Sequence, residues 1–273
     1  MKVVLFCGGQ GLRMRDADNQ AKPMVHIGSR PLLWHVMKYY AHHGHKDFIL
    51  CLGYKAETVK QYFLNYNECV SNDFVLSRGG KEVELLANDI QDWRITFADT
   101  GQNANIGERL LAVSKYLQDE PAFLANYSDG LTDLPLEQQL DEFHRDGKVA
   151  SFLCVRPNLS YHAVEMEEGS RLVAGIRPIN DGSVRVNGGY FVFRKEIFKY
   201  LRAGEELVEA PFQRLIEDRQ LAGHVYDGFW ASMDTFKDKQ QLERLYLAGV
   251  APWEVWRRHA SNDPGSRGAR MAG

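Results

Sequence analysis

A glycine-rich turn placed directly after a short apolar segment constrains the fold of this chain most. The segment from Lys2 to Cys7 is apolar without alternation, which is typical of a strand buried on both faces of a parallel sheet. Gly8-Gly9-Gln10-Gly11 follows, and glycines permit positive φ and close backbone approach, so that successive amide N–H groups can point at a phosphate. Arg13 adds a cationic fork. We therefore expect a central strand that ends in a phosphate-binding turn.

Two better-known glycine motifs do not fit this turn. A dinucleotide-binding fingerprint needs a third glycine at the position of Met14, and no acidic ribose partner is evident at the expected distance. A P-loop needs Gly-Lys followed by Ser or Thr, whereas Gly80-Lys81 precedes Glu82. A turn that binds no ligand stays an alternative at this point.

Strand-like and helix-like apolar patterns alternate along the first half of the chain. Strands are predicted over 47–52, 94–98 and 122–127, helices over 32–43 and 109–117, and a further helical face is formed by Val59, Tyr62, Phe63 and Tyr66. This alternation predicts an α/β fold with a doubly wound, mostly parallel, Rossmann-like sheet that binds ligands at the carboxyl ends of its strands.

The second half has fewer helical patterns. Strands predicted over 149–155, 163–165, 172–176 and 186–193 indicate a smaller part with mixed or antiparallel pairing, and Gly79-Gly80 marks residues 71–84 as an exposed hairpin or loop. We expect one domain over 1–260, with halves at 1–135 and 136–260. The stretch 261–273 is rich in Gly, Ser and Arg and is expected to be a disordered tail.

Composition excludes several classes of protein. A net charge of −3 and a pI near 6.3 give no basic excess for binding a nucleic-acid backbone. The apolar run before Gly8 is too short for a signal peptide or a membrane span, so we expect a soluble, cytoplasmic protein with no membrane partner. The cysteines form no C-x-x-C pair, which indicates reduced thiols.

Three charged residues stand where a phosphate site at the sheet edge would need them. Lys22 precedes Pro23, which holds it in an extended backbone suited to reaching a phosphate; a solvated surface lysine is the alternative. Asp129 follows an apolar strand and precedes a glycine, so it is either a Mg²⁺ ligand or part of an ordinary Asp-Gly turn. Asp234 precedes a predicted helix and is either a second metal ligand or the N-cap of that helix.

The order and spacing of these motifs resemble those of the sugar-1-phosphate nucleotidyltransferases, or nucleotide-sugar pyrophosphorylases, and within them those of the glucose-1-phosphate cytidylyltransferases. The resemblance runs from Met1 to about Trp256. Besides the glycine turn and Lys22-Pro23-Met24, it is carried by Pro31-Leu-Leu-Trp-His35, Asp47-Phe48-Ile49, Gly53-Tyr54-Lys55, Asp99-Thr100-Gly101, Arg109-Leu110, Asp129-Gly130, Val186-Asn187-Gly188-Gly189-Tyr190-Phe191-Val192, Phe229-Trp230, Met233-Asp234-Thr235 and Ala251-Pro252-Trp253.

The resemblance implies a reaction and a role for each matching residue. CTP and a sugar 1-phosphate would form a CDP-sugar and pyrophosphate, with Mg²⁺ as cofactor, a nucleotide-binding half over 1–135 and a sugar-binding half with a C-terminal helix over 136–260. The nucleotide would contact Phe6, Cys7, Gly8, Gly9, Gln10, Gly11, Leu12, Arg13, Ala104, Arg109 and Ser128. Arg13, Lys22, Asp129 and Asp234 would be catalytic, with both aspartates holding the metal, and His162, Arg177, Asn187 and Gly188 would face the sugar. Relatives commonly form homo-oligomers, in which Trp253 and Trp256 could cover a partner.

Several positions depart from the family pattern. Leu12 replaces a threonine of the phosphate loop, and Glu108 adds a carboxylate beside the nucleotide pocket. On the sugar side His162 replaces a glycine, and Ile176-Arg177 replaces Glu-Lys. Such changes alter the recognition of sugar hydroxyls, which leads to the hypothesis that the acceptor is a modified sugar or a cyclitol phosphate. Two alternatives stay open: dTTP, UTP or GTP as the donor, and a sensing protein of the same fold that has lost turnover.

Overall fold

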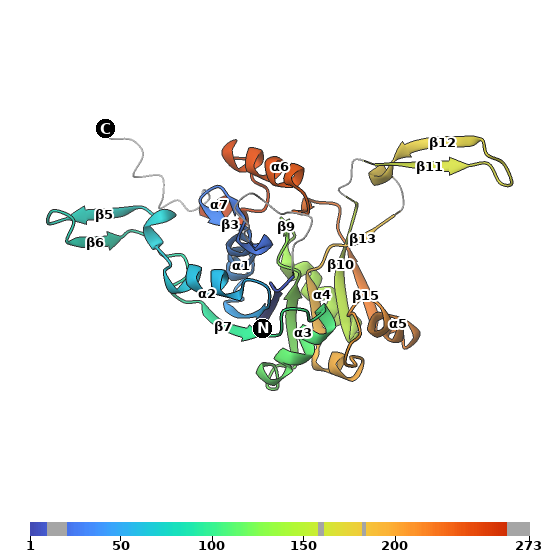
Figure 1. The fold of residues 1–273 in the computed structure, drawn as a ribbon, viewed down its shortest axis with the longest axis horizontal. Helices are drawn as coiled ribbons and strands as arrows, with labels where there is room; N and C mark the ends of the chain where they lie inside the picture. The colour runs from blue at the N-terminus through green and yellow to red at the C-terminus, as the bar shows by residue number, and fades with distance from the viewer. Residues whose placement is uncertain (10–20, 158–160, 182–183, 261–273) are drawn as a thin grey trace.

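The computed structural model describes residues 1–9, 21–157, 161–181 and 184–260, so that the segment 10–20 and the predicted tail over 261–273 lie outside the described residues. A central eight-stranded sheet has the order β13-β10-β14-β8-β1-β4-β7, and β15 joins it by pairing with β10. Its strands are β1 (Val3–Phe6), β4 (Asp47–Leu52), β7 (Arg94–Asp99), β8 (Ala122–Asn126), β10 (Ala150–Val155), β13 (Val186–Asn187), β14 (Phe191–Arg194) and β15 (Leu221–Val225). Helices surround this sheet (Figure 1), which confirms the predicted α/β class.

β1 lies in the middle of the sheet, as its sequence predicts. It pairs in parallel with β4 on one side and with β8 on the other. Val3 and Leu5 belong to the apolar core that includes α1 (Leu32–His42), whereas Val4 and Phe6 belong to the core that includes α3 (Ile106–Val113). Because both faces are covered, every position of the strand needs an apolar residue, which explains the absence of alternation.

The carboxyl ends of several strands meet at one edge of the sheet. β1, β4, β7 and β8 are parallel, and β10 and β15 have the same direction because the antiparallel β14 lies between β8 and β10. Gly8 and Gly9 after β1 and the segment Ser128-Asp129 after β8 both leave the sheet at this edge. It is the edge at which ligands bind in open α/β sheets.

The strand expected over 186–193 is two strands. β13 ends at Asn187 and β14 begins at Phe191, and between them Gly189 and Tyr190 have φ values of 74° and 49°. A positive φ interrupts extended pairing, and glycine adopts it without steric cost. Since β13 pairs antiparallel with Cys154 and Val155, the turn at 188–190 runs back along β10 beside Leu153, and β14 then begins opposite Ala125, near the carboxyl end of β8.

Helix boundaries follow local capping as much as apolar periodicity. α1 and α2 (Ala56–Leu64) confirm two of the predicted helices. α3 begins at Ile106 and not at Arg109, because Asn105 and Glu108 form a capping box in which each side chain accepts a hydrogen bond from the other residue's backbone N–H, at 2.9 Å in both cases. Among the longer elements that escaped prediction are α4 (Leu136–Asp146), α5 (Ala210–Glu217) and β15. The remaining elements are β2 (His26–Ile27), β3 (Arg30–Pro31), β9 (Gly130–Thr132), β16 (Trp230–Ser232), α6 (Phe236–Leu247), α7 (Val255–Ala260) and the 3-10 helices η2 (Lys22–Met24), η3 (Glu68–Val70), η4 (Ser114–Tyr116), η5 (Ile179–Asp181) and η6 (Lys195–Lys199).

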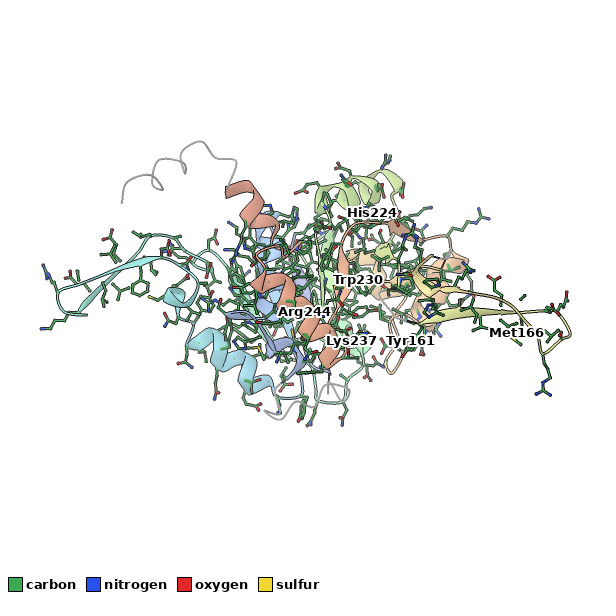
Figure 2. All side chains as sticks on the ribbon, turned by 90° about the horizontal axis from the view of Figure 1, so that it is seen from above. Tyr161, Met166, His224, Trp230, Lys237 and Arg244 are labelled. Carbon is green, nitrogen blue, oxygen red and sulfur yellow. The ribbon has the colours of Figure 1, made fainter. Side chains whose placement is uncertain are left out.

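Two β-hairpins project from opposite sides of the central body (Figure 1). One pairs β5 (Phe74–Ser77) with β6 (Glu82–Leu85), which confirms the hairpin expected over 71–84. The other pairs β11 (His162–Met166) with β12 (Val173–Pro178), and Figure 2 shows it extending from Tyr161 to Met166 and beyond. The antiparallel pairing of β11 and β12 confirms that the second half of the chain departs from a purely parallel arrangement.

The C-terminal tryptophans pack within the chain. Trp253 is 1% exposed, lies against Phe229 and donates a hydrogen bond to Nδ1 of His35 at 3.3 Å. The interpretation that Trp253 covers a partner surface is therefore wrong, and Trp256 lies half-buried against Trp34. All cysteines are free thiols, as predicted. Among the residues that the structure describes, no helix has the length and apolar composition to cross a membrane.

Candidate active site

Lys22, Asp129 and Asp234 come together at the carboxyl edge of the sheet. The ammonium group of Lys22 donates to Oδ2 of Asp129 at 2.9 Å and to Oδ1 of Asp234 at 2.7 Å. Lys22 is the first residue of the 3-10 helix η2, and the extended backbone is that of Ala21 before it, so the expectation that Pro23 holds Lys22 in an extended backbone is wrong. Lys22 is therefore not a solvated surface lysine, because its charge is half-buried between two carboxylates.

A short antiparallel ribbon brings the two aspartates together. β9 begins directly after Asp129 and pairs with β16, which ends two residues before Asp234. The N–H of Met233 donates to the carbonyl of Asp129 at 2.9 Å and extends this pairing to the aspartates themselves. Residues far apart in the sequence thus reach one point because β9 and β16 are neighbours.

Asp234 is not the N-cap of the helix that follows it. Thr235 caps α6 in a capping box with Asp238, so the N-cap interpretation of Asp234 is wrong. Oδ2 of Asp234 instead accepts a hydrogen bond from the hydroxyl of Ser232 at 2.7 Å, and Oδ1 accepts from Lys22. Its carboxylate is therefore oriented toward Asp129 by a strand residue and by a cation.

The electrostatics of this group favour a cation between the carboxylates. Burial lowers the pKa of the Lys22 ammonium, but the nearby carboxylates of Asp129 and Asp234 more than offset this, so the net pKa lies above the ordinary value. Burial raises the pKa of Asp129, and Lys22 only partly opposes the rise. Bringing two carboxylates this close is costly unless positive charge lies between them, and here the lysine supplies it.

The donor set fits Mg²⁺. Within the described ranges, no group of three or more His, Cys, Asp and Glu residues comes together as a metal-binding set. Mg²⁺ binds through one or two carboxylates and completes its shell with water and phosphate oxygens. Asp129 and Asp234 provide such a pair, and the Lys22 ammonium occupies the place between them that a cation would take.

Ser128 connects this pair to the end of β1. Its hydroxyl donates to the carbonyl of Phe6 at 2.8 Å, and its N–H donates to Oδ1 of Asn126 at 2.8 Å. Its φ of 64° turns the chain sharply after β8. Asp129 therefore lies beside the residues at which the glycine turn begins.

Arg109 is buried next to Gly8, where that turn begins. Its guanidinium is 2% exposed and donates to the carbonyls of Gly8 at 3.0 Å, Leu52 at 3.2 Å and Gly101 at 3.0 Å, and to the hydroxyl of Thr100 at 2.7 Å. A Cβ added to Gly8 would lie 2.1 Å from Nη1 of Arg109. Close packing of this arginine thus requires a glycine at position 8, independently of any phosphate.

Glu108 has a structural partner. The capping box engages its carboxylate with the N–H of Asn105, so the carboxylate added beside the predicted nucleotide pocket satisfies the first turn of α3. Ala104 lies half-buried just before this cap. Gln10, Gly11, Leu12 and Arg13 lie outside the described residues, whereas Phe6, Cys7, Gly8 and Gly9 lie at the end of β1, where they were expected.

Asn187 and Gly188 lie beside the ribbon of β9 and β16. Nδ2 of Asn187 donates to the hydroxyl of Tyr127 at 3.2 Å, and its Oδ1 accepts from the N–H of Gly189 at 2.9 Å. The indole N–H of Trp230, in β16, donates to the carbonyl of Gly188 at 2.9 Å. Trp230 also borders a pocket of about 300 Å³ that Arg156, Tyr226 and Asp227 line. Prediction from sequence did not assign Trp230 a role, although it occupies the strand that leads to Asp234.

His162 and Arg177 lie apart from Asn187 and Gly188 in the fold. Both belong to the hairpin of β11 and β12, and both are exposed. The guanidinium of Arg177 donates to Oε1 of Glu165 across the hairpin at 2.9 Å. Figure 2 shows the hairpin leaving the body near Tyr161.

Comparison with known proteins identifies the family. A glucose-1-phosphate cytidylyltransferase of Salmonella typhi is 36% identical over 258 residues, which cover 94% of this chain and 100% of that protein. The chain belongs to the glucose-1-phosphate cytidylyltransferase family. A mannose-1-phosphate guanyltransferase of Gibberella zeae is more distant, with 26% identity over 92% of this chain and 65% of that protein. No protein-family model matches the chain.

Solved structures agree with the fold. UDP-glucose pyrophosphorylase complexed with UDP-glucose aligns with a TM-score of 0.66 at 15% identity, over 91% of this chain and 98% of that one. HddC from Yersinia pseudotuberculosis complexed with GMP-PN aligns with a TM-score of 0.63 at 17% identity, over 90% and 99%. As a member of the glucose-1-phosphate cytidylyltransferase family, the chain is a nucleotidyltransferase whose reaction joins a nucleotide to a sugar phosphate.

Proposed function

We propose that the enzyme converts CTP and a sugar 1-phosphate into a CDP-sugar and pyrophosphate at the edge where β1, β8 and β16 end. One observation carries the proposal: Lys22 lies between the carboxylates of Asp129 and Asp234, next to the residues that begin the glycine turn. A buried cation and two carboxylates at this edge match the needs of a reaction between two polyanions.

The reaction is an in-line displacement. An oxygen of the sugar 1-phosphate forms a bond to the α-phosphorus of CTP while the bond from that phosphorus to the bridging oxygen breaks, and the electron pair leaves with pyrophosphate. A phosphate monoester dianion is nucleophilic near neutral pH, so no general base is required. Lys22 places positive charge between the α-phosphate and the attacking phosphate, and Arg13 and the amides of the glycine turn would hold the triphosphate.

Asp129 and Asp234 would hold Mg²⁺ in this scheme. When bound, the ion supplies further positive charge to the phosphate oxygens. Both side chains lie within hydrogen-bonding distance of one ammonium group, which supports their sharing one cation. Asn187 and Gly188 would face the sugar, on the side of the ribbon where Trp230 lies.

The acceptor is proposed to be a modified sugar or a cyclitol phosphate instead of unmodified glucose 1-phosphate. The hairpin that carries His162 and Arg177 supports this, because the charge of Arg177 is paired with Glu165 and the glutamate of the usual pattern is Ile176. A site that loses a carboxylate able to accept from a hydroxyl loses selectivity for that hydroxyl.

Pyrophosphate release tests both proposals in one panel. Purified enzyme is incubated with Mg²⁺, each of CTP, dTTP, UTP and GTP, and glucose 1-phosphate or a set of deoxy, amino, acidic and cyclitol phosphates. The highest kcat/KM is expected with CTP and an acceptor other than glucose 1-phosphate. If CTP and glucose 1-phosphate were the best pair, only the proposal on the acceptor would be contradicted. Preference for another triphosphate would contradict the proposal that CTP is the donor. No pyrophosphate release from any pair would favour a sensing protein.

We also propose a cytoplasmic homo-oligomer. Both projecting hairpins have one apolar face: Phe74 pairs with Leu85 and Leu76 with Val83 in the first, and Val164 pairs with Ile176 in the second. A two-stranded hairpin with an uncovered apolar face is marginally stable in water, so a second copy of the chain is the proposed cover. Light scattering should give a multiple of the chain mass, and the substitution Ile176→Lys should lower it; a monomer before substitution would contradict the proposal.

A further inference from the structure

The indole of Trp230 lies between the two parts of the proposed site. β16 carries Trp230 at one end and leads to Asp234 at the other, while its partner β9 begins after Asp129. The indole N–H donates to the carbonyl of Gly188 at 2.9 Å. One side chain therefore contacts the turn proposed to face the sugar and belongs to the ribbon that positions the proposed metal ligands.

Two glycines make room for this indole. A Cβ added at Gly188 would lie 3.1 Å from Nε1 of Trp230, and a Cβ added at Gly130 would lie 3.3 Å from the same atom. Both distances are shorter than ordinary van der Waals contacts, so a side chain at either position would require the ring to shift by a few tenths of an ångström. Gly130 in the ribbon and Gly188 in the turn thus both lie close against the N–H end of the indole.

The turn at 187–190 is also tied to the ribbon and to β10. The hydroxyl of Tyr190 donates to the carbonyl of Gly130 at 2.9 Å, the N–H of Gly188 donates to the carbonyl of Leu153 in β10 at 2.8 Å, and the N–H of Leu153 donates to the carbonyl of Gly189 at 3.0 Å. The peptide between Gly188 and Gly189 is held at both ends, because its carbonyl accepts from the indole of Trp230 and its N–H donates to Oδ1 of Asn187 at 2.9 Å. Asn187 is the neighbouring residue, and its orientation depends on the same peptide geometry.

We infer that Trp230 is a positioning residue that holds the sugar-facing turn in register with Asp129 and Asp234, and so holds the site in the conformation that binds the sugar of the acceptor. The inference rests on the proposed function for its effect on turnover. It assigns Trp230 no contact with the reacting atoms. Its effect should therefore concentrate on the affinity for the sugar phosphate, because the triphosphate is proposed to bind at the residues that follow β1 and not at the turn 187–190.

The substitution Trp230→Phe tests this. It keeps an aromatic ring between Gly130 and Gly188 but removes the N–H donor together with part of the indole ring system, so a control that loses the same atoms elsewhere is needed. Loss of one neutral hydrogen bond is expected to raise the KM for the sugar phosphate by about 3- to 10-fold, with kcat and the KM for the triphosphate changed less than about 2-fold.

Trp34→Phe is the matched control. The indole N–H of Trp34 donates to the hydroxyl of Tyr66 at 2.8 Å, so the substitution deletes the same kind of hydrogen bond in α1, in a different part of the fold. It should leave both KM values unchanged. Equal changes in the two KM values of Trp230→Phe, or no change beyond that of Trp34→Phe, would overturn the inference.

Hydrogen exchange measures the positioning without turnover. Mass spectrometry should show faster exchange of the amides in residues 187–190 of Trp230→Phe, and unchanged exchange there in Trp34→Phe. Unchanged exchange in both variants would overturn the inference. Faster exchange together with no pyrophosphate release from the unsubstituted enzyme would uphold Trp230 as the positioning residue and reject the proposed function instead.

Discussion

Arg109 and Gly8 should be energetically coupled, because the arginine occupies the space that a larger residue at position 8 would need. A Cβ at Gly8 would lie 2.1 Å from Nη1 and 2.4 Å from Cζ of Arg109. The substitution Gly8→Ala must therefore displace the guanidinium from the carbonyls of Gly8, Leu52 and Gly101. If phosphate approach were the sole reason for this glycine, no such coupling would exist in the absence of nucleotide.

The expected magnitude follows from the contacts of Arg109. Breaking a buried, charged hydrogen-bond network by removing one member costs about 3–5 kcal/mol of unfolding free energy. In a chain of this size that corresponds to a decrease in Tm of roughly 10 °C. Arg109→Ala should show this loss, and Gly8→Ala should show a comparable one, because both release the same hydrogen bonds.

Thermal unfolding of both single variants and the double variant provides the assay. In the Arg109→Ala background, Gly8→Ala should cost less than about 1 kcal/mol, since the obstructing guanidinium is gone. Additive losses in the double variant would refute the coupling. Gly9→Ala is the control, because a Cβ at Gly9 has nothing within 4 Å.

Three further outcomes are expected. Lys22→Met should lower kcat by roughly 10²- to 10³-fold, the usual cost of removing one preorganised charge. Lys46→Met, which breaks the exposed ion pair with Asp92, should retain activity in the same pyrophosphate assay. Comparable activities of the two variants would show that Lys22 has no catalytic role. Burial lowers the pKa of His35 to about 4. Between about pH 6.5 and about pH 4 the imidazole is therefore protonated in the unfolded chain but neutral in the folded chain. The unfolding free energy should fall by about 3 kcal/mol as the pH drops through this range. Denaturant titrations at several pH values should show a shallower fall for His35→Asn, and an identical slope would contradict this assignment. Glu108→Gln should keep the capping box and leave the base preference unchanged, and a switch of preferred triphosphate would show instead that Glu108 reads the base.

The first half of the fold could be predicted because its signals are local. The run before Gly8 lacks alternation since both faces of β1 are covered, and the helix over 32–43 is visible from its length and apolar content. α4 escaped prediction because its buried positions are few and include Gln139, a polar residue whose amide donates to the carbonyl of Tyr190 at 2.7 Å. The break at 188–190 has a local signal in Gly188-Gly189, but the apolar residues on both sides of it led to the prediction of one strand over 186–193.

The candidate site was predictable only residue by residue. Lys22, Asp129 and Asp234 each had an ordinary structural explanation, and their sharing one site was implied only by the family resemblance. The pairing of β9 with β16 is what brings the two aspartates together. That pairing joins distant segments of three residues each, too short to carry a periodic pattern. The contacts of Arg109 were likewise hidden, since its acceptors are backbone carbonyls that sequence does not distinguish. The hydrogen bond of Trp230 could not be predicted for the same reason, because its acceptor is a backbone carbonyl, that of Gly188.

Divalent-metal binding tests the shared role of Asp129 and Asp234 most directly. Free Mn²⁺ is measured by electron paramagnetic resonance during titration of the enzyme with a non-hydrolysable CTP analogue present, for the unsubstituted chain, Asp129→Asn, Asp234→Asn and the double variant. One site per chain is expected, with affinity lost in either single variant and no further loss in the double variant. Full affinity in either single variant would show that the two carboxylates do not hold one ion.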